Sequence, residues 1–216
     1  MSRVVGPGAT RAGALNLVAS VSFVLGGSLF ALGALLAQLD LVALTAVNVT
    51  YLVGGFFFSL GGYTSILLAD ATAGRRARLS AIVLFTGTLL FAVSLVAAFA
   101  QGLTPRQSDG WIWLPDILGC LCFLASGHLA MLDAGGGHVA VRLHETGWWV
   151  IAVNQLGSIL FFLAGLAAFI RPATDQVIDA GLVNWGTFAG AACFALAGVV
   201  QAFDTPTPTR TAVQHT

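Results

Sequence analysis

Long apolar runs separated by short polar segments dominate the pattern of this chain of 216 residues. Each run has on the order of 20 residues, the length that a helix needs to cross the hydrocarbon core of a bilayer. A helix also satisfies its own backbone hydrogen bonds where no water is present. The pattern therefore predicts an all-α membrane protein, a compact bundle of six transmembrane helices. The predicted spans are residues 14–39, 43–68, 79–99, 112–132, 148–170 and 182–202.

The segments outside the spans predict one membrane domain, residues 14–203, with short ends. Residues 1–13 are expected to form a basic arm, and residues 204–216, rich in Thr and Pro, a disordered cytoplasmic tail. A cleavable signal peptide is the alternative interpretation of the first apolar run. That run is longer than the hydrophobic region of a signal peptide, which favours a retained span.

The arginines predict the orientation, because basic residues beside short loops resist translocation. With the N-terminus inside, only Arg106 and Arg171 lie in outer loops. The inner segments hold Arg3, Arg11, Arg75, Arg76, Arg78, Arg142 and Arg210. Both termini are therefore predicted to be cytoplasmic, in a multi-pass protein of the cell membrane.

Composition supports this class. Hydrophobic residues make up 57% of the chain and charged residues 8%, and the mean hydropathy is +0.91, whereas about a quarter of the residues of a soluble protein are charged. The net charge of zero gives no reason to expect nucleic acid as a partner, so the predicted partner is the lipid bilayer. Cys120, Cys122 and Cys193 all lie inside apolar runs and are interpreted as small core residues rather than redox groups.

A triplet of glycine, phenylalanine four residues later and a small residue three further on recurs once in each apolar run. The copies are Gly26, Phe30, Gly33; Gly54, Phe58, Gly61; Gly87, Phe91, Ser94; Gly119, Phe123, Ser126; Gly157, Phe161, Ala164; and Gly190, Phe194, Ala197. These positions share one helix face, so each triplet makes a stripe on which helices can pack closely in lipid. We interpret the triplets as an internal repeat. Two arrangements fit it, an inverted three-plus-three architecture or three helical hairpins.

Additional glycines suggest self-association. Gly54, Gly55, Gly61 and Gly62 offer more small surface than one neighbouring helix requires. A homo-oligomer is therefore one alternative for the assembly.

Three stretches resemble the YrhK-like family of bacterial membrane proteins, whose short helices carry a related signature of Gly-Ser, Phe and a small residue. They are residues 114–126, 153–161 and 184–194, and the resemblance covers mainly residues 111–203. It implies a bacterial multi-pass protein. It lends no functional residues to this chain.

Asp116 and His128 are the ionisable candidates for chemistry inside a span. An intramembrane carboxylate often marks an ion or proton path, but Asp116 follows Pro115 and lies just below Trp113, where it would also suit a helix N-terminus at the headgroup level. His128 lies twelve residues further, within about 120° of the same helix face. A relay between them is one hypothesis, and a hydrogen-bonded packing histidine is the other.

Polar residues also recur near the starts of other spans. Asn48 and Asn184 accompany Asp116 in the spans that descend from outside, and Asn154 lies in an ascending span. The inner loop with Asp133, His138, His144 and Glu145 matches no metal-binding spacing and is interpreted as a solvated connector. No cofactor, metal site or catalytic group is predicted.

The sequence favours a non-enzymatic, polytopic membrane protein with a structural or interaction role. The alternative is a transporter or channel for a small solute or ion, with Asp116 and His128 on its path. An intramembrane enzyme or redox protein is a third class, for which the sequence offers only Asp116 with His128 or Cys120 as a reactive pair.

Overall fold

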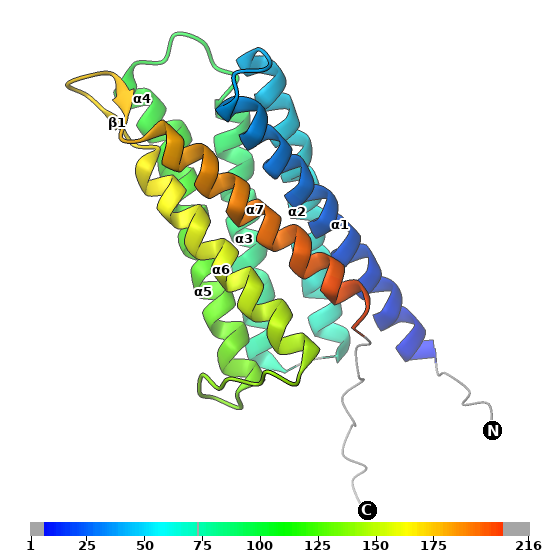
Figure 1. The fold of residues 1–216 in the computed structure, drawn as a ribbon. Coiled ribbons are helices and arrows are strands. Elements are labelled where there is room, and N and C mark those ends of the chain that lie inside the picture. Colours follow the sequence, from blue (N-terminus) through cyan, green and yellow to red (C-terminus); the bar gives the residue numbers. More distant parts are fainter. Residues whose placement is uncertain (1–6, 73, 205–216) are drawn as a thin grey trace, which may run out of the picture.

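The structure, a computed structural model, describes residues 7–72 and 74–204. Long helices form a bundle, with a short strand pair at one end (Figure 1). In chain order the elements are α1 (Pro7–Gln38), α2 (Leu44–Thr72), α3 (Arg75–Ala97), α4 (Pro105–Ser108), the π-helical segment η1 (Asp109–Trp113), α5 (Leu114–Ala134), α6 (Thr146–Ala167), β1 (Ile170–Arg171), β2 (Gln176–Val177) and α7 (Ala180–Ala202).

Six helices in the described part of the chain are long and apolar enough to cross a membrane, which confirms the predicted number of spans. Five of them are α1, α2, α3, α6 and α7. The remaining one runs without interruption through α4, η1 and α5, from Pro105 to Ala134. The chain therefore has the architecture of a multi-pass membrane protein.

Several helices begin earlier than predicted. α1 starts at Pro7, since proline suits the first turn of a helix, so the second half of the predicted basic arm is helical. The rest of that arm, and the predicted tail from residue 205 on, lie outside the described residues. The fourth spanning helix starts at Pro105 because Thr104 caps it: the Gln107 backbone N–H donates to Thr104 Oγ1 at 3.3 Å.

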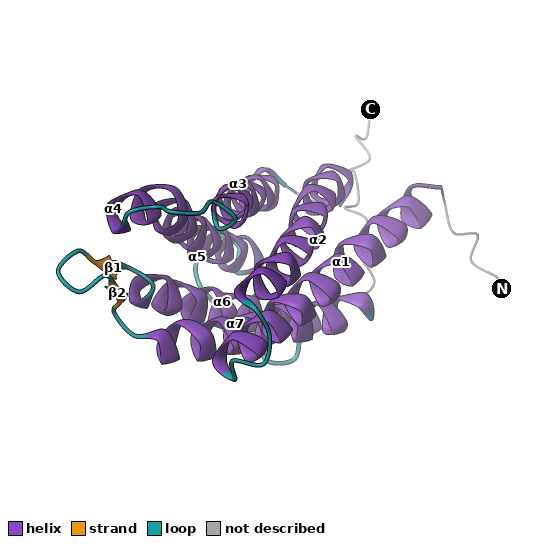
Figure 2. Cartoon of the chain, turned by 90° about the horizontal axis from the view of Figure 1, so that it is seen from above, coloured by secondary structure: helices purple, strands orange, loops and turns teal. Residues whose placement is uncertain are grey.

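The six long helices form a closed ring (Figure 2). Its order is α1, α2, α3, α5, α6 and α7, after which α7 packs against α1 again. Each helix therefore contacts its neighbours along the chain, and the first and last helices close the ring. The interior of the bundle is faced by all six.

Close backbone contact joins the helices in three hairpins, α1 with α2, α3 with α5 and α6 with α7. A Cβ atom added to Gly26 would lie 3.1 Å from the Gly54 carbonyl oxygen and 3.0 Å from the Phe58 ring. A Cβ atom on either Gly157 or Gly190 would lie 2.9 Å from the carbonyl oxygen of the other. The same contacts in the middle hairpin involve Gly87, Phe91, Gly119 and Phe123. Glycine thus lets the two backbones of each hairpin approach, as small residues do between helices in lipid.

The other glycines of α2 are used within the chain. A Cβ atom on Gly55 would meet the Leu95 side chain, and one on Gly62 would lie 3.2 Å from the Phe85 Cα atom. Both neighbours belong to α3. The surplus glycine surface on which the sequence argument for self-association rested is therefore covered by α3.

Six phenylalanines, one from each long helix, meet in the middle of the bundle and are called the phenylalanine cluster: Phe30, Phe58, Phe91, Phe123, Phe161 and Phe194. Every residue of the six triplets is buried. Ring centroids lie 5.0 Å apart for Phe91 and Phe123 and 5.5 Å apart for Phe161 and Phe194, within hairpins. Between hairpins, Phe58 lies 5.5 Å from Phe194. Such aromatic pairs contribute about 0.5 to 1.5 kcal/mol each beyond their buried area.

The bundle has two distinct ends, the terminal end and the far end. The terminal end is where α1 begins and α7 finishes, and it also carries the α2–α3 and α5–α6 connections (Figure 1). Asn16 fastens it, because its Nδ2 atom donates to the Gln201 carbonyl oxygen at 2.9 Å and its Oδ1 atom accepts from Gln201 Nε2 at 3.1 Å. The far end carries the α1–α2 turn, α4 and the β1–β2 hairpin.

Candidate functional site

Two cavities lie inside the bundle, on either side of the phenylalanine cluster. The far cavity has a volume of about 310 Å³, and its lining runs from Asn48, Asp109 and Ile170 near the far end to rings of the cluster. The terminal cavity has a volume of about 340 Å³ and begins on the other side of Phe123 and Phe194. Phe123 lines both cavities. The cluster therefore forms the partition between two hollows of similar size.

One position of the repeated pattern, three residues before each triplet glycine, contributes to the lining of both cavities. On α2, α5 and α7, which run from the far end to the terminal end, this position lines the far cavity with Tyr51, Asp116 and Thr187. On α1, α3 and α6, which run the other way, it lines the terminal cavity with Phe23, Leu84 and Asn154. Equivalent positions thus place polar side chains in the far cavity and mostly apolar ones in the terminal cavity.

The mouth of the far cavity is built by η1. A π-helical turn inserts an extra residue into the helix and is often found at functional sites. Asp109, Ile112 and Trp113 of this segment line the cavity. Asp109 Oδ1 accepts from the Ile170 backbone N–H at 3.0 Å, and Trp113 Nε1 donates to the Gly165 carbonyl oxygen at 2.8 Å. These bonds attach the β1–β2 hairpin and α6 to the start of the fourth span.

Trp113 is held inside the protein at the start of the fourth span. Its ring lies 5.0 Å from that of Phe169, edge to face, and its indole N–H is satisfied inside the protein. Trp111, two residues earlier, is exposed and remains suited to the membrane interface.

Asp116 lies on the wall of the far cavity, about two helical turns from Phe123. Its Oδ2 atom lies 3.2 Å from the position that a Cβ atom on Gly165 would take, so it faces α6 at a point where that helix has no side chain. Among the described residues no group donates a hydrogen bond or forms an ion pair to this carboxylate. Neighbouring Cys120 donates instead to the Phe161 carbonyl oxygen at 3.4 Å.

The structural explanation that the sequence offered for Asp116 does not hold. It required a helix N-terminus near Asp116, but the helix is continuous from Pro105, and Trp113 already has helical dihedral angles (φ −65°, ψ −45°). The backbone N–H of Leu114 is bonded to the Asp109 carbonyl oxygen, so no free helix end lies beneath Asp116. The carboxylate is an interior group of the span.

The structure does not bring Asp116 and His128 together. His128 is exposed on the outer surface of the bundle, and it lines neither the far nor the terminal cavity. The asparagines are also dispersed. Asn48 lines the far cavity and donates to the Ala98 carbonyl oxygen at 3.0 Å, Asn154 lines the terminal cavity, and Asn184 lines neither of them.

The terminal cavity is polar at its sides. Ser80 and Ser126 exchange hydrogen bonds: each hydroxyl donates to the carbonyl oxygen of the other residue at 2.9 Å. Gln155, next to Gly127 of the lining, donates from Nε2 to the Leu124 carbonyl oxygen at 3.4 Å, and its buried Oε1 atom has no hydrogen-bond partner among the described residues. Sequence reasoning selected Ser126 only as the small residue of a triplet and did not select Ser80 or Gln155, because Ser and Gln in an apolar run give no signal until the facing helix is known.

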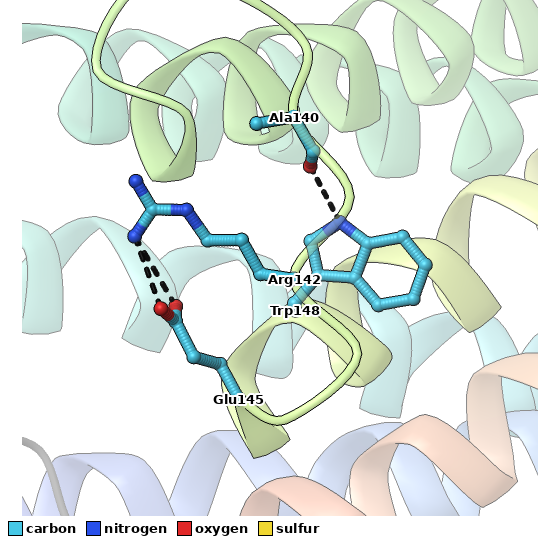
Figure 3. A network of polar contacts seen from close by, with 4 residues as sticks. All are labelled: Ala140, Arg142, Glu145 and Trp148. Carbon is cyan, nitrogen blue, oxygen red and sulfur yellow. Dashed lines mark hydrogen bonds and ion pairs between the residues drawn. The ribbon is translucent and has the colours of Figure 1, made fainter.

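The α5–α6 connection at the terminal end is exposed, as a solvated connector would be, and it carries local polar contacts. Arg142 pairs with Glu145 at 3.1 Å, and Trp148 Nε1 donates to the Ala140 carbonyl oxygen at 2.9 Å (Figure 3). Gly136 and Gly137 take positive φ angles of 70° and 109°, which glycine adopts readily as the chain leaves α5. Within residues 7–72 and 74–204, no group of three or more His, Cys, Asp or Glu side chains is placed to hold a metal ion.

Comparisons with known proteins give no relative from which a role could be carried over. No protein-family model matches the chain, no curated protein matches it, and no solved structure matches it. The function is therefore argued from the geometry of the two cavities and the cluster between them.

Proposed function

We propose that this protein is a non-enzymatic transporter or channel of the cell membrane that passes a small solute through the middle of the bundle. The observation that carries the proposal is the pair of cavities separated by the phenylalanine cluster, with Asp116 on the wall of one of them. Ionisable residues within spans usually face a cavity and mark substrate or ion pathways. Asp116 lies within a span, lines the far cavity and has no hydrogen-bond or ion-pair partner among the described residues.

The phenylalanine cluster is the barrier in this proposal. Rings that meet at 5.0 to 5.5 Å leave no polar surface on which a hydrated solute could pass, so the structure corresponds to a closed state. Opening requires the hairpins to move relative to one another. The triplet glycines make their reciprocal contacts within hairpins. Gly27 of α1 and Gly198 of α7 make equally close backbone contacts between the first and third hairpins, so we expect these two hairpins to move together against the second.

The repeat and the orientation belong to the same proposal. The three hairpins with matching glycine and phenylalanine contacts favour three copies of one helical hairpin over an inverted three-plus-three arrangement. The terminal end holds Arg11, Arg75, Arg76, Arg78 and Arg142, whereas Arg106 and Arg171 lie at the far end. The distribution favours a cytoplasmic terminal end. The resemblance of residues 111–203 to the YrhK-like family is kept as a proposed relationship.

A packed structural bundle is the second candidate, and the closeness of the helices favours it. A membrane scaffold needs close backbone contact between helices and a filled centre, and the bundle has both. A scaffold needs no path for a solute. The two candidates differ in one property that can be measured, the access of water to the cavities.

Thiol labelling tests that access. In a chain whose three native cysteines are replaced by alanine, single cysteines are placed at Thr187 in the far cavity and at Asn154 in the terminal cavity. A small membrane-impermeant methanethiosulfonate reagent is then added from each side of the membrane. Solute passage predicts labelling of Thr187→Cys from outside and of Asn154→Cys from inside.

Leu118→Cys is the matched control, because Leu118 lies on the exposed face of α5, where lipid would cover it, and it should stay unlabelled. If neither Thr187→Cys nor Asn154→Cys is labelled under conditions where an exposed loop cysteine reacts, water does not reach the two cavities. That result would replace the transport proposal with the packed bundle.

A further inference from the structure

We infer that the far cavity binds a small organic monocation with an ammonium head, which pairs with the Asp116 carboxylate while its alkyl groups rest on the aromatic walls. This inference rests on the proposed function and names its class of substrate. Three properties of the cavity carry it: charge, lining chemistry and size.

Charge selects a cation. Asp116 has no hydrogen-bond donor or counter-ion among the described residues, and no arginine or histidine belongs to the described lining of the far cavity. The chain has no lysine. A carboxylate away from bulk water is costly unless it is paired, so the site is suited to a ligand that supplies one positive charge. Asp109, near the far end of the cavity, differs from Asp116 in that its Oδ1 atom accepts a hydrogen bond from the Ile170 N–H at 3.0 Å.

The lining selects an organic cation over a metal ion. Aromatic rings surround the cavity: five phenylalanines of the cluster together with Tyr51 and Trp113. An ammonium group that has lost its water is attracted to the faces of such rings, and aromatic cages are a common way to recognise quaternary ammonium groups. Calcium would need six to eight oxygen ligands, and magnesium would need near-ideal octahedral geometry. The described lining offers the Asp116 carboxylate with the Asn48 amide oxygen and a few hydroxyl groups, and no group of three or more His, Cys, Asp or Glu side chains among the described residues is placed to hold a metal ion.

Size limits the ligand. A cavity of about 310 Å³ corresponds to about ten water volumes, which accommodates a tetraalkylammonium or amino-alcohol cation but not an extended polyamine. The other acid of the described lining is Asp109, seven residues or about 10 Å away along the helix, so a compact cation that pairs with Asp116 does not reach it. The ligand class is therefore monovalent, compact and partly apolar.

The experiment compares choline with 3,3-dimethylbutan-1-ol, its neutral isostere, by calorimetric titration of the full chain in lipid nanodiscs. Choline is expected to bind about tenfold more tightly than the alcohol, or better, because only choline has the charge that Asp116 and the rings attract. Asp116→Asn should remove that preference. Asp175→Asn is the matched control, because it makes the same acid-to-amide change at an exposed far-end residue that does not line the cavity. Asp175 has a φ of 55°, which Asn tolerates. This variant should bind choline as the unmodified chain does.

Each other outcome overturns the inference. Equal binding of choline and the alcohol, or choline binding that survives Asp116→Asn, means that the cavity does not select a cation at Asp116. Absence of binding by both probes to the unmodified chain overturns it as well. The labelling of Thr187→Cys and Asn154→Cys separates these results from failure of the proposed function, because accessible cavities would keep solute passage standing with a different ligand class.

Discussion

The far and terminal cavities are built from equivalent positions but are chemically different. Tyr51, Asp116 and Thr187 occupy in one half the positions that Phe23, Leu84 and Asn154 occupy in the other. The backbone contacts that shape both halves are nearly the same in the three hairpins. The difference indicates that the glycine and phenylalanine pattern makes the scaffold, whereas the chemistry of each cavity is set by positions outside the triplets, where the two halves diverge.

The largest expected effect comes from breaking the scaffold that both cavities share. Gly190→Leu would press a Cβ atom, 2.9 Å away, onto the Gly157 carbonyl oxygen, and backbone in a packed hairpin cannot move aside. Overpacking usually costs about 1 to 3 kcal/mol of stability, and more where the neighbouring atoms cannot move. Here the neighbour is backbone, so we expect the larger cost and loss of the monodisperse folded protein. Fluorescence-detected size-exclusion chromatography of the detergent extract measures it.

Gly13→Leu is the control for that variant, since a Cβ atom on Gly13 meets nothing within 4 Å. It should elute as the unmodified protein does. A monodisperse Gly190→Leu protein of unchanged thermal stability would show that close approach of α6 and α7 is not needed for the fold.

The second effect concerns the partition. Phe123→Ala removes the ring that lines both cavities, so the two hollows should merge. We expect a loss of about 3 to 5 kcal/mol of stability and, in proteoliposomes, a leak of small cations that the unmodified protein lacks. Phe56→Ala, at an exposed position, should change neither the melting temperature nor the leak appreciably. A stable Phe123→Ala protein with no leak would mean that the cavities are not connected through this ring.

The third effect separates Asp116 from residues that only hold the fold. Asp116→Asn should raise the thermal stability of the ligand-free protein, because burying an unpartnered carboxylate costs more than burying an amide; we expect a gain of about 1 to 3 kcal/mol. Thermal unfolding in detergent gives the value. His128→Asn, on the exposed surface, should stay within about 0.5 kcal/mol of the unmodified chain. A clear loss of stability in Asp116→Asn would show that the carboxylate is held by the fold and serves structure.

The scaffold was predictable from the sequence because its cause is local. Apolar length fixes the number of spans, and a triplet that repeats on one helix face marks the residues that are buried. The early start of the fourth span was missed because residues 105–111 are polar. Arg106, Gln107 and Asp109 have the composition of a loop, and only the structure shows the Thr104 cap and η1 that make them helical. That error about where the helix begins produced the mistaken structural explanation for Asp116.

The cavities could not be predicted in the same way. Their existence depends on closure of the ring by α1 and α7, a contact between the two ends of the chain. The pairing of Asp116 with His128 failed for a related reason: twelve residues of helix drift enough in angle for one side chain to face the cavity and the other the outer surface. The sequence did contain one usable indication of Tyr51 and Thr187: each lies three residues before a triplet glycine, the same position that Asp116 occupies.

The smallest expected effect tests whether the terminal half is fastened by its own polar pair. Ser126→Ala removes the hydroxyl that donates to the Ser80 carbonyl oxygen at 2.9 Å and lies 3.1 Å from the Ser80 hydroxyl. Hydrogen bonds between helices in membranes contribute about 0.6 kcal/mol on average, so we expect a loss of that order and no change in choline binding. A double-mutant cycle with Ser80→Ala isolates the coupling, and Thr86→Ala, whose hydroxyl bonds only within its own helix, is the control. If Ser126→Ala weakens choline binding as much as Asp116→Asn does, the two halves do not work as separate compartments, and the cluster between them is less of a barrier than its packing indicates.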